Sequence, residues 1–214
     1  MSWHQTEKTN PKRDESQILV KREEIKKKFR GMENGIITGE IIVLMWDESH
    51  LLWGNACGSV WGKTNEKVKI SMTNFRAHQT YFGAIEAKSK KFILEAYPSG
   101  NGKNTVDFIK KLRDADAKLL IIWDGASYHR SSEIKLYLNE VNKGLEEKDW
   151  KVTCMLFAPN APEQNPVEDI WLKGKNWIRK HFAENETFAK VKQSFSYFLK
   201  STSFDSHKFE WYNL

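Results

Sequence analysis

The sequence is poor in cysteine, has no long apolar run and shows no signature of covalent catalysis. Its 214 residues include two cysteines, Cys57 and Cys154, too few for a disulfide framework or a cysteine metal cluster. No apolar run approaches the roughly 20 residues that cross a bilayer, and the charged N-terminus lacks the apolar stretch of a signal peptide. No Ser–His–Asp or Cys–His pattern indicates a nucleophilic side chain. These absences predict a soluble cytoplasmic protein with no membrane partner.

The composition is that of a basic globular protein. Hydrophobic residues make up 40% of the chain and aromatic residues 13%, which excludes a disordered protein. The formal net charge is +6 and the pI is about 9.1. Charge of this size is a modest indication of a polyanionic partner such as a nucleic acid.

Residues 1–38 differ from the rest of the chain in charge. They have few apolar residues and an excess of basic ones, which are Lys8, Lys12, Arg13, Lys21, Arg22, Lys26, Lys27, Lys28 and Arg30. One interpretation is a solvated helix or linker. The other is a basic arm that follows a DNA backbone through its phosphates. The domain prediction is therefore a basic linker or arm over 1–38, followed by one domain over 39–214.

The first half of that domain has the pattern of strands. Residues 40–53 predict one strand, 58–73 a second, and 80–97 two strands joined by a turn at 88–91. Together these segments predict an antiparallel meander.

The second half alternates helices and strands. The predicted elements are a helix capped by Asn104 or Thr105 that runs to about Ala115, a strand at 118–124, a helix from Ser131 or Ser132, a strand at 151–157, and helices at about 166–182 and 187–200. A meander followed by alternating helices and strands predicts an α/β fold of the RNase H-like type, with a mixed five-stranded sheet flanked by helices.

Three carboxylates lie at the ends of predicted elements. Asp47 and Asp124 each follow an apolar strand, and Glu168 opens a helix after a turn-rich segment. Gathered over a sheet, these side chains would repel one another unless cations lay between them, and oxygen ligands suit Mg²⁺ or Mn²⁺. The arrangement suggests two-metal phosphoryl transfer on a nucleic acid. For Asp47 the alternative is a polar residue that closes a strand, and Glu48 is the substitute ligand, because neighbouring strand residues face opposite sides.

The other two carboxylates also have ordinary explanations. Asp124 is followed by Gly125, and an Asp-Gly pair favours a turn, although glycine also lets a phosphate or metal approach the backbone. His129 either contacts the scissile phosphate or forms a hydrogen bond within a turn. Glu168 lies three residues after Asn165, as in a capping box. Trp171 and Leu172, three and four residues further, are expected to seat this helix beside the sheet.

These motifs resemble the DDE transposases of the insertion-sequence 630 and Tc-mariner superfamily. The matching segments are 46–49 (Trp-Asp-Glu-Ser), 123–129 (Trp-Asp-Gly-Ala-Ser-Tyr-His) and 158–171, which ends in Asn-Pro-x-Glu-x-x-Trp. Residues 60–63 are similar to a family segment between the first two strands. The last motif is the most specific, and the resemblance covers about residues 39–182.

The resemblance implies a metal-dependent strand-transfer enzyme of a prokaryotic-type cytoplasm, acting at the nucleoid. Asp47, Asp124 and Glu168 would be the catalytic and metal-binding triad, with Mg²⁺ as the cofactor and Mn²⁺ as an alternative. The partners would be transposon ends and target DNA, and two subunits would join the two ends in a homodimer.

The sequence departs from the family in two places. The interval between Asp124 and Glu168 holds 43 residues, longer than the usual mid-thirties, and the surplus is expected in a solvent-exposed extension around 141–150. Full-length relatives carry N-terminal helix-turn-helix domains, whereas a basic segment precedes the domain here. A separate N-terminal helix-turn-helix polypeptide, or a decayed copy, would explain this difference.

Basic residues supply the predicted DNA contacts. The candidates are Lys63, His129, Lys173, Lys175, Arg179 and Lys180, four of which lie on the helix that Glu168 opens. An exposed helix face is the ordinary explanation for those four. Three functions remain open from the sequence: an active transposase domain, a catalytically incompetent DNA-binding remnant or regulator, and another RNase H-fold nuclease.

Overall fold

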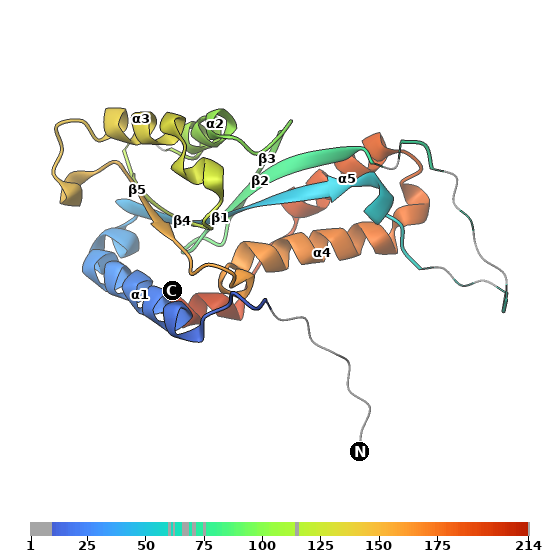
Figure 1. Ribbon diagram of the computed structural model, residues 1–214, viewed down its shortest axis with the longest axis horizontal. Coiled ribbons are helices and arrows are strands. Elements are labelled where there is room, and N and C mark those ends of the chain that lie inside the picture. Colours follow the sequence, from blue (N-terminus) through green and yellow to red (C-terminus); the bar gives the residue numbers. More distant parts are fainter. Residues whose placement is uncertain are drawn as a thin grey trace, which may run out of the picture.

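One mixed sheet forms the centre of the protein. A computed structural model of the chain describes residues 10–59, 61, 63–65, 69, 72–74, 76–113 and 116–213. Its five strands lie in the order β3-β2-β1-β4-β5 (Figure 1). They are β1 Ile41–Leu52, β2 His78–Glu86, β3 Phe92–Tyr97, β4 Lys118–Trp123 and β5 Val152–Leu156. The first three are antiparallel neighbours, and β4 and β5 continue the sheet in parallel from β1.

Helices cover both faces of the sheet (Figure 1). They are α1 Glu15–Thr38, α2 Gly102–Leu112, α3 Ser132–Val141, α4 Pro166–Lys180 and α5 Phe188–Ser201. One core cluster joins α1, α4 and α5 to the sheet, and a second joins α2 and α3 to its other face. Because both faces are covered, the strands β1 and β4 can be apolar along most of their length.

Alternation along β1 assigns each residue to a face. Val43 and Met45 belong to the core cluster on the α4 side, and Leu44 and Trp46 to the cluster on the α2 side. Successive strand residues point to opposite faces. Asp47 therefore continues the α4 side and Glu48 the α2 side.

The predicted strand at 58–73 is wrong for the residues that the structure describes. Between positions 56 and 77, none of the described residues lies in a strand, and Val68 and Ile70 lie outside the described residues. Along β1, β2 pairs with Leu44–Leu52 and β4 with Ile41–Met45. The described residues between positions 56 and 77 belong to neither of these pairings.

The other predicted elements are confirmed with small shifts. The predicted pair at 80–97 corresponds to β2 and β3, and the predicted later strands and helices correspond to β4, α3, β5, α4 and α5. The helix α2 begins earlier than predicted, because the side chain of Asn101 accepts a hydrogen bond from the backbone N–H of Asn104 at 2.9 Å. Asn101 is thus the N-cap in place of Asn104 or Thr105.

The basic N-terminal segment contains a helix that packs on the domain. In α1 the N-cap Asp14 accepts from the backbone N–H of Ser16, and Gly39 ends the helix with φ +86°. Ile25 and Phe29 are buried in the core on the α4 side. The helix is long but charged, and no helix among the described residues is apolar enough to span a membrane. Whether residues 1–38 also act as an arm on DNA stays a prediction.

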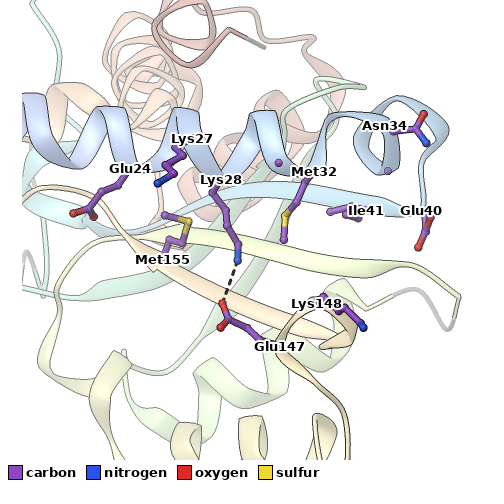
Figure 2. A pocket seen from close by; sticks show the side chains of 12 residues that line it. Glu24, Lys27, Lys28, Met32, Asn34, Glu40, Ile41, Glu147, Lys148 and Met155 are labelled. Carbon is purple, nitrogen blue, oxygen red and sulfur yellow. Dashed lines mark hydrogen bonds and ion pairs between the residues drawn. The ribbon is translucent and has the colours of Figure 1, made fainter.

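The extension between α3 and β5 lies at the far end of β4 from Asp124. Residues 143–150 are exposed, as predicted. Asp149 lies 3.4 Å from Lys118, the first residue of β4, whereas Asp124 follows its last. Figure 2 shows Lys28 of α1 pointing toward Glu147 of this extension. Their Nζ and Oε1 atoms lie 3.4 Å apart, and both residues line a pocket of about 870 Å³. The extra residues are therefore accommodated away from the end of β4 that carries Asp124.

Candidate active site

The three predicted carboxylates line one cavity. Its volume is about 420 Å³, and its walls include Asp47, Asp124 and Glu168 together with the segment 157–162. The register between β1 and β4 explains the convergence, since Met45 is paired with Ile122, two residues before each aspartate. The parallel strands deliver both aspartates to one level, and the first turn of α4 brings Glu168 beside them.

Asp47 is a buried carboxylate held by a tryptophan. Its exposure is 8%, and its Oδ2 accepts a hydrogen bond from Nε1 of Trp171 at 3.0 Å. Burial and the nearby charge of Glu168 raise the pKa of Asp47 well above its ordinary value, against the lowering effect of the Trp171 bond. Asp47 faces the cavity and Glu48 does not, which favours Asp47 over Glu48 as the cavity ligand.

Asp124 forms a turn with its side chain and still exposes its carboxylate to solvent. Its Oδ1 accepts from the backbone N–H of Ala126 at 3.0 Å, as in an Asx turn, and lies 3.1 Å from Nδ1 of His129. The side chain is still 54% exposed. Burial opposes ionisation, but the bonds from His129 and Ala126 outweigh it and hold the pKa of Asp124 below its ordinary value. Forming the turn therefore leaves the carboxylate ionised beside the cavity.

Glu168 is not needed to cap its helix. The cap is Asn165, whose Oδ1 accepts from the backbone N–H of Val167 at 3.1 Å. In a capping box Glu168 would accept the N–H of Asn165, but that N–H donates to the carbonyl of Pro162 at 3.0 Å. Burial raises the pKa of Glu168, whereas the charges of Lys175 and Lys208 lower it. The capping explanation thus fails, and the carboxylate remains available at the cavity.

The donor set fits divalent cations. Oxygen ligands in carboxylates are the preferred ligands of Mg²⁺ and suit Mn²⁺. Burial raises the pKa of both Asp47 and Glu168, and the charge of Glu168 adds to the shift at Asp47. A cation between the two carboxylates would favour their ionised forms. A different group, Glu48, Asp124 and His129, has ligand atoms within 4.8 Å of one another. In that group both ring nitrogens of His129 lie at hydrogen-bond distance from acidic or carbonyl oxygens.

Trp171 seats α4 on the sheet, but Leu172 does not. Trp171 is 1% exposed and meets the ring of Phe92 on β3 edge-on, with ring centroids 5.5 Å apart. Leu172 is 56% exposed, so its predicted contact with the sheet is wrong. Leu172 lies 100° further around the helix than Trp171, which turns it away from the buried face.

Gly83 makes room for Trp171. It is paired with Asp47 in the sheet, and a Cβ at this position would lie 2.6 Å from Cζ2 of Trp171 and 2.5 Å from Cζ of Phe92. We expect Gly83→Ala to displace Trp171 and lower the free energy of unfolding by about 1–3 kcal/mol. Urea denaturation measures this change. The matched control is Gly31→Ala, where a Cβ meets nothing within 4 Å and helix propensity favours alanine. Equal stability of Gly83→Ala and the wild type would contradict the packing argument.

Two of the predicted DNA-binding residues extend from the cavity along α4. Lys175 and Arg179 lie seven and eleven residues after Glu168, so they share its stripe of the helix. Both are half-buried. Burial lowers the pKa of Lys175, and the charges of Glu168 and Asp47 oppose that shift, so these groups lie close enough to interact. A basic stripe beside an acidic cavity can hold a phosphate backbone that passes the carboxylates.

The remaining predicted DNA contacts are dispersed. Lys173 and Lys180 are exposed on another side of α4, and Lys63 is exposed in the crossing from β1 to β2. The ring of His129 is 1% exposed and bonded on both nitrogens. The structure thus favours the hydrogen-bonding interpretation of His129 over a direct phosphate contact.

Two contacts that shape the cavity were not predicted from the sequence. Nδ2 of Asn165 donates to the carbonyl of Trp46 at 2.9 Å and so ties the start of α4 to β1. Nζ of Lys208 donates to the carbonyl of Asn165 at 3.2 Å. The Asn-Pro-x-Glu-x-x-Trp motif contains Asn165 and was a usable signal. Lys208 lies 43 residues further along the chain, and no local pattern links it to the motif.

Comparisons with known proteins agree with this geometry. Residues 42–189 match the sequence profile of the DDE superfamily endonuclease family. The solved catalytic domain of Mos1 mariner transposase has a similar fold, with a TM-score of 0.51, 11% identity, and coverage of 98% of this chain and 89% of that one. This likeness and the strand order confirm the predicted RNase H-like fold.

Larger Mos1 assemblies contain the same fold. The Mos1 strand transfer complex gives a TM-score of 0.58 at 9% identity over 99% of this chain. The Mos1 mariner paired end complex with Mn gives a TM-score of 0.57 at 9% identity over 98% of this chain. This chain covers 62% of the length of each of those Mos1 chains. A search of curated protein sequences gave no significant match.

Proposed function

Because this chain belongs to the DDE superfamily endonuclease family, we propose that it is a transposase catalytic domain that cleaves DNA and transfers strands at transposon ends. The observation that carries the proposal is the convergence of Asp47, Asp124 and Glu168 on one cavity. In this proposal residues 39–214 form the catalytic domain and residues 1–38 an accessory basic arm.

The three carboxylates are the proposed ligands of two divalent cations, Mg²⁺ or Mn²⁺. Cations held there would supply activation of the attacking hydroxyl and neutralisation of charge on the leaving oxygen. Each carboxylate has its own support: Trp171 orients Asp47, the turn at Ala126 orients Asp124, and the cap at Asn165 leaves Glu168 available. One similar Mos1 structure is described as a paired end complex with Mn.

The proposed DNA path runs from the cavity along α4. Lys175 and Arg179 would bind phosphates next to the cleaved bond, and Lys173, Lys180 and Lys63 would add contacts further away. Mos1 structures are described as strand transfer and paired end complexes. By analogy we propose a homodimer that holds two transposon ends and target DNA.

The decisive experiment compares wild type with Asp124→Asn. We expect wild type to nick a DNA duplex in the presence of Mn²⁺, and Asp124→Asn to do so at least about 10²-fold more slowly, the scale of removing one preorganised catalytic group. Calorimetry with the duplex present should show Mn²⁺ binding that requires Asp124. The control Asp149→Asn makes the same chemical change at an exposed site on the extension.

Two outcomes would overturn the proposal. Equal nicking by wild type and Asp124→Asn would show that the cavity does not cleave DNA. Mn²⁺ binding that does not depend on Asp124, even with DNA present, would indicate a DNA-binding remnant that has kept the fold.

A further inference from the structure

A buried pair, Glu48 and His129, lies behind the cavity on the other face of the sheet. Glu48 follows Asp47 on β1 and points to the α2 side, where its side chain is 7% exposed. The ring of His129 is 1% exposed. The two side chains meet with Nε2 of His129 at 3.1 Å from Oε1 of Glu48. Neither residue lines the cavity that holds Asp47, Asp124 and Glu168.

The His129 ring reaches Asp124 from this side. Its Nδ1 lies 3.1 Å from the backbone carbonyl of Asp124 and 3.1 Å from Oδ1 of the same residue. The ring stacks on Trp123, with centroids 4.2 Å apart and planes 5° from parallel. The edge of Trp46 meets it at 5.9 Å. Contacts on the face and edge of the ring leave it little freedom to turn.

All the atoms that face the ring nitrogens are acceptors. Carboxylate and carbonyl oxygens of Glu48 and Asp124 can accept hydrogen bonds, and an imidazole ring meets acceptors on both sides when both nitrogens carry a hydrogen. A buried carboxylate with no donor would be costly. His129 therefore supplies a donor to Glu48, and Glu48 fixes which way the ring presents its Nδ1–H.

Oδ1 of Asp124 is consequently occupied on the protein side. It accepts from the backbone N–H of Ala126 at 3.0 Å and lies 3.1 Å from Nδ1 of His129, whose N–H also faces the Asp124 carbonyl. These contacts restrict the rotation of the carboxylate and leave Oδ2 for a ligand in the cavity. Carboxylates that bind metal ions are themselves usually hydrogen-bonded by outer residues, and loss of those residues weakens metal binding.

We propose that Glu48 and His129 are positioning residues that hold Asp124 in the orientation it needs to bind a divalent cation. The inference rests on the proposed function, because it assigns a purpose to Asp124 as a ligand. It also accounts for Glu48, the carboxylate beside Asp47 that the cavity does not use. In this proposal His129 acts through Asp124.

Four variants separate positioning from simple packing. His129→Phe keeps a ring to stack on Trp123 but removes both donors. His129→Asn keeps one donor near the place of Nδ1, and Glu48→Gln keeps the shape of Glu48 without its charge. The fourth is the double variant Glu48→Gln with His129→Phe. Ile134→Val serves as the matched control, since Ile134 is 1% exposed in the same core cluster and carries no polar side-chain atom.

The readouts are Mn²⁺ affinity by calorimetry with a DNA duplex and the melting temperature of the metal-free protein. We expect His129→Phe to bind Mn²⁺ about 10–100-fold more weakly, the range found for support residues behind metal ligands. His129→Asn should retain more affinity than His129→Phe, whatever their melting temperatures. The double variant should bind no more weakly than His129→Phe, because Glu48 acts through the ring.

The results distinguish this inference from the proposed function. Wild-type affinity in His129→Phe, while Asp124→Asn loses Mn²⁺ binding, would overturn the positioning role and leave the function intact. If Mn²⁺ affinity falls only as much as the melting temperature predicts, as in Ile134→Val, Glu48 and His129 have a packing role alone. That result would also overturn the positioning role. If wild type and Asp124→Asn bind Mn²⁺ alike, the proposed function fails and the inference fails with it.

Discussion

Replacing Asp47 by asparagine is expected to make the metal-free protein more stable at pH 7 while abolishing DNA cleavage. Asp47 is 8% exposed, and burial together with Glu168 raises its pKa well above the ordinary value. Asparagine has nearly the same shape, and its Oδ1 can accept the hydrogen bond that Nε1 of Trp171 donates. The variant therefore keeps the packing and removes the charge that the fold opposes. Cleavage should fall at least about 10³-fold, the upper scale for loss of one catalytic group.

The extra stability of Asp47→Asn over the wild type depends on pH, in a way that follows from the direction of the Asp47 pKa shift. In the unfolded chain Asp47 titrates near pH 3.9, and in the folded protein it titrates higher. Below the unfolded pKa both states hold the proton, so the wild type has no penalty. Between the two pKa values the wild type loses about 1.4 kcal/mol of stability for each pH unit, and above the folded pKa the loss is constant. The advantage of Asp47→Asn should thus appear as pH rises and vanish in acid.

Melting temperatures from about pH 3.5 to pH 8 measure this effect. Asp149→Asn, an exposed control, should show no comparable rise. Mn²⁺ should stabilise the wild type and leave Asp47→Asn nearly unchanged, since a ligand stabilises only the state it binds. An Asp47→Asn variant that is less stable than wild type at neutral pH would contradict the account of a charge opposed by burial.

Replacing Asp169 by asparagine is expected to destabilise the protein far more than replacing its partner Lys208. Lys208 belongs to a C-terminal 3-10 helix, η6, His207–Tyr212, and its Nζ lies 2.7 Å from Oδ1 of Asp169. The Lys208 side chain is 7% exposed and the Asp169 side chain 35%. Asp169→Asn leaves a buried ammonium without its counter-ion, whereas the carboxylate left by Lys208→Met can still reach water.

We therefore expect an asymmetric loss of stability. Asp169→Asn should lower the free energy of unfolding by about 2–4 kcal/mol, somewhat less than for a fully buried pair because Asp169 is partly exposed. Lys208→Met should cost less than about 1.5 kcal/mol, since methionine fills a similar volume. Urea denaturation of both variants measures the difference, with the exposed Lys200→Met as control. Equal losses, or a larger loss for Lys208→Met, would refute the burial argument.

The carboxylates were predictable because each follows a strong local signal. The apolar runs before Asp47 and Asp124 mark buried strands, and the motif around Glu168 marks a helix start. Asp47 is the predicted ligand with Glu48 as the substitute, because the sequence does not show which face of β1 meets α4. In the structure Trp171 of α4 donates to Asp47, and a contact between such distant segments leaves no local pattern.

The buried face of α1 has an apolar pattern in the sequence, but the many charged residues around it make that pattern hard to recognise. Ile18, Ile25, Phe29 and Ile36 are buried on one side of α1 at intervals of seven, four and seven residues, a helical spacing visible in the sequence. The surrounding lysines and arginines made a solvated segment or arm the simpler interpretation.

The contact of Lys208 with Asn165 had no local sequence pattern, because it joins η6 to the start of α4 across 43 residues.

The position of the extension affects how related catalytic domains can be recognised from their sequences. Its exposed residues meet α1 and the start of β4, whereas Asp124 follows the end of that strand. Length can therefore change at one end of the sheet without moving the carboxylates at the other. The number of residues between Asp124 and Glu168 therefore does not determine the distance between their side chains. A search that fixed this spacing would reject a chain whose three carboxylates surround one cavity.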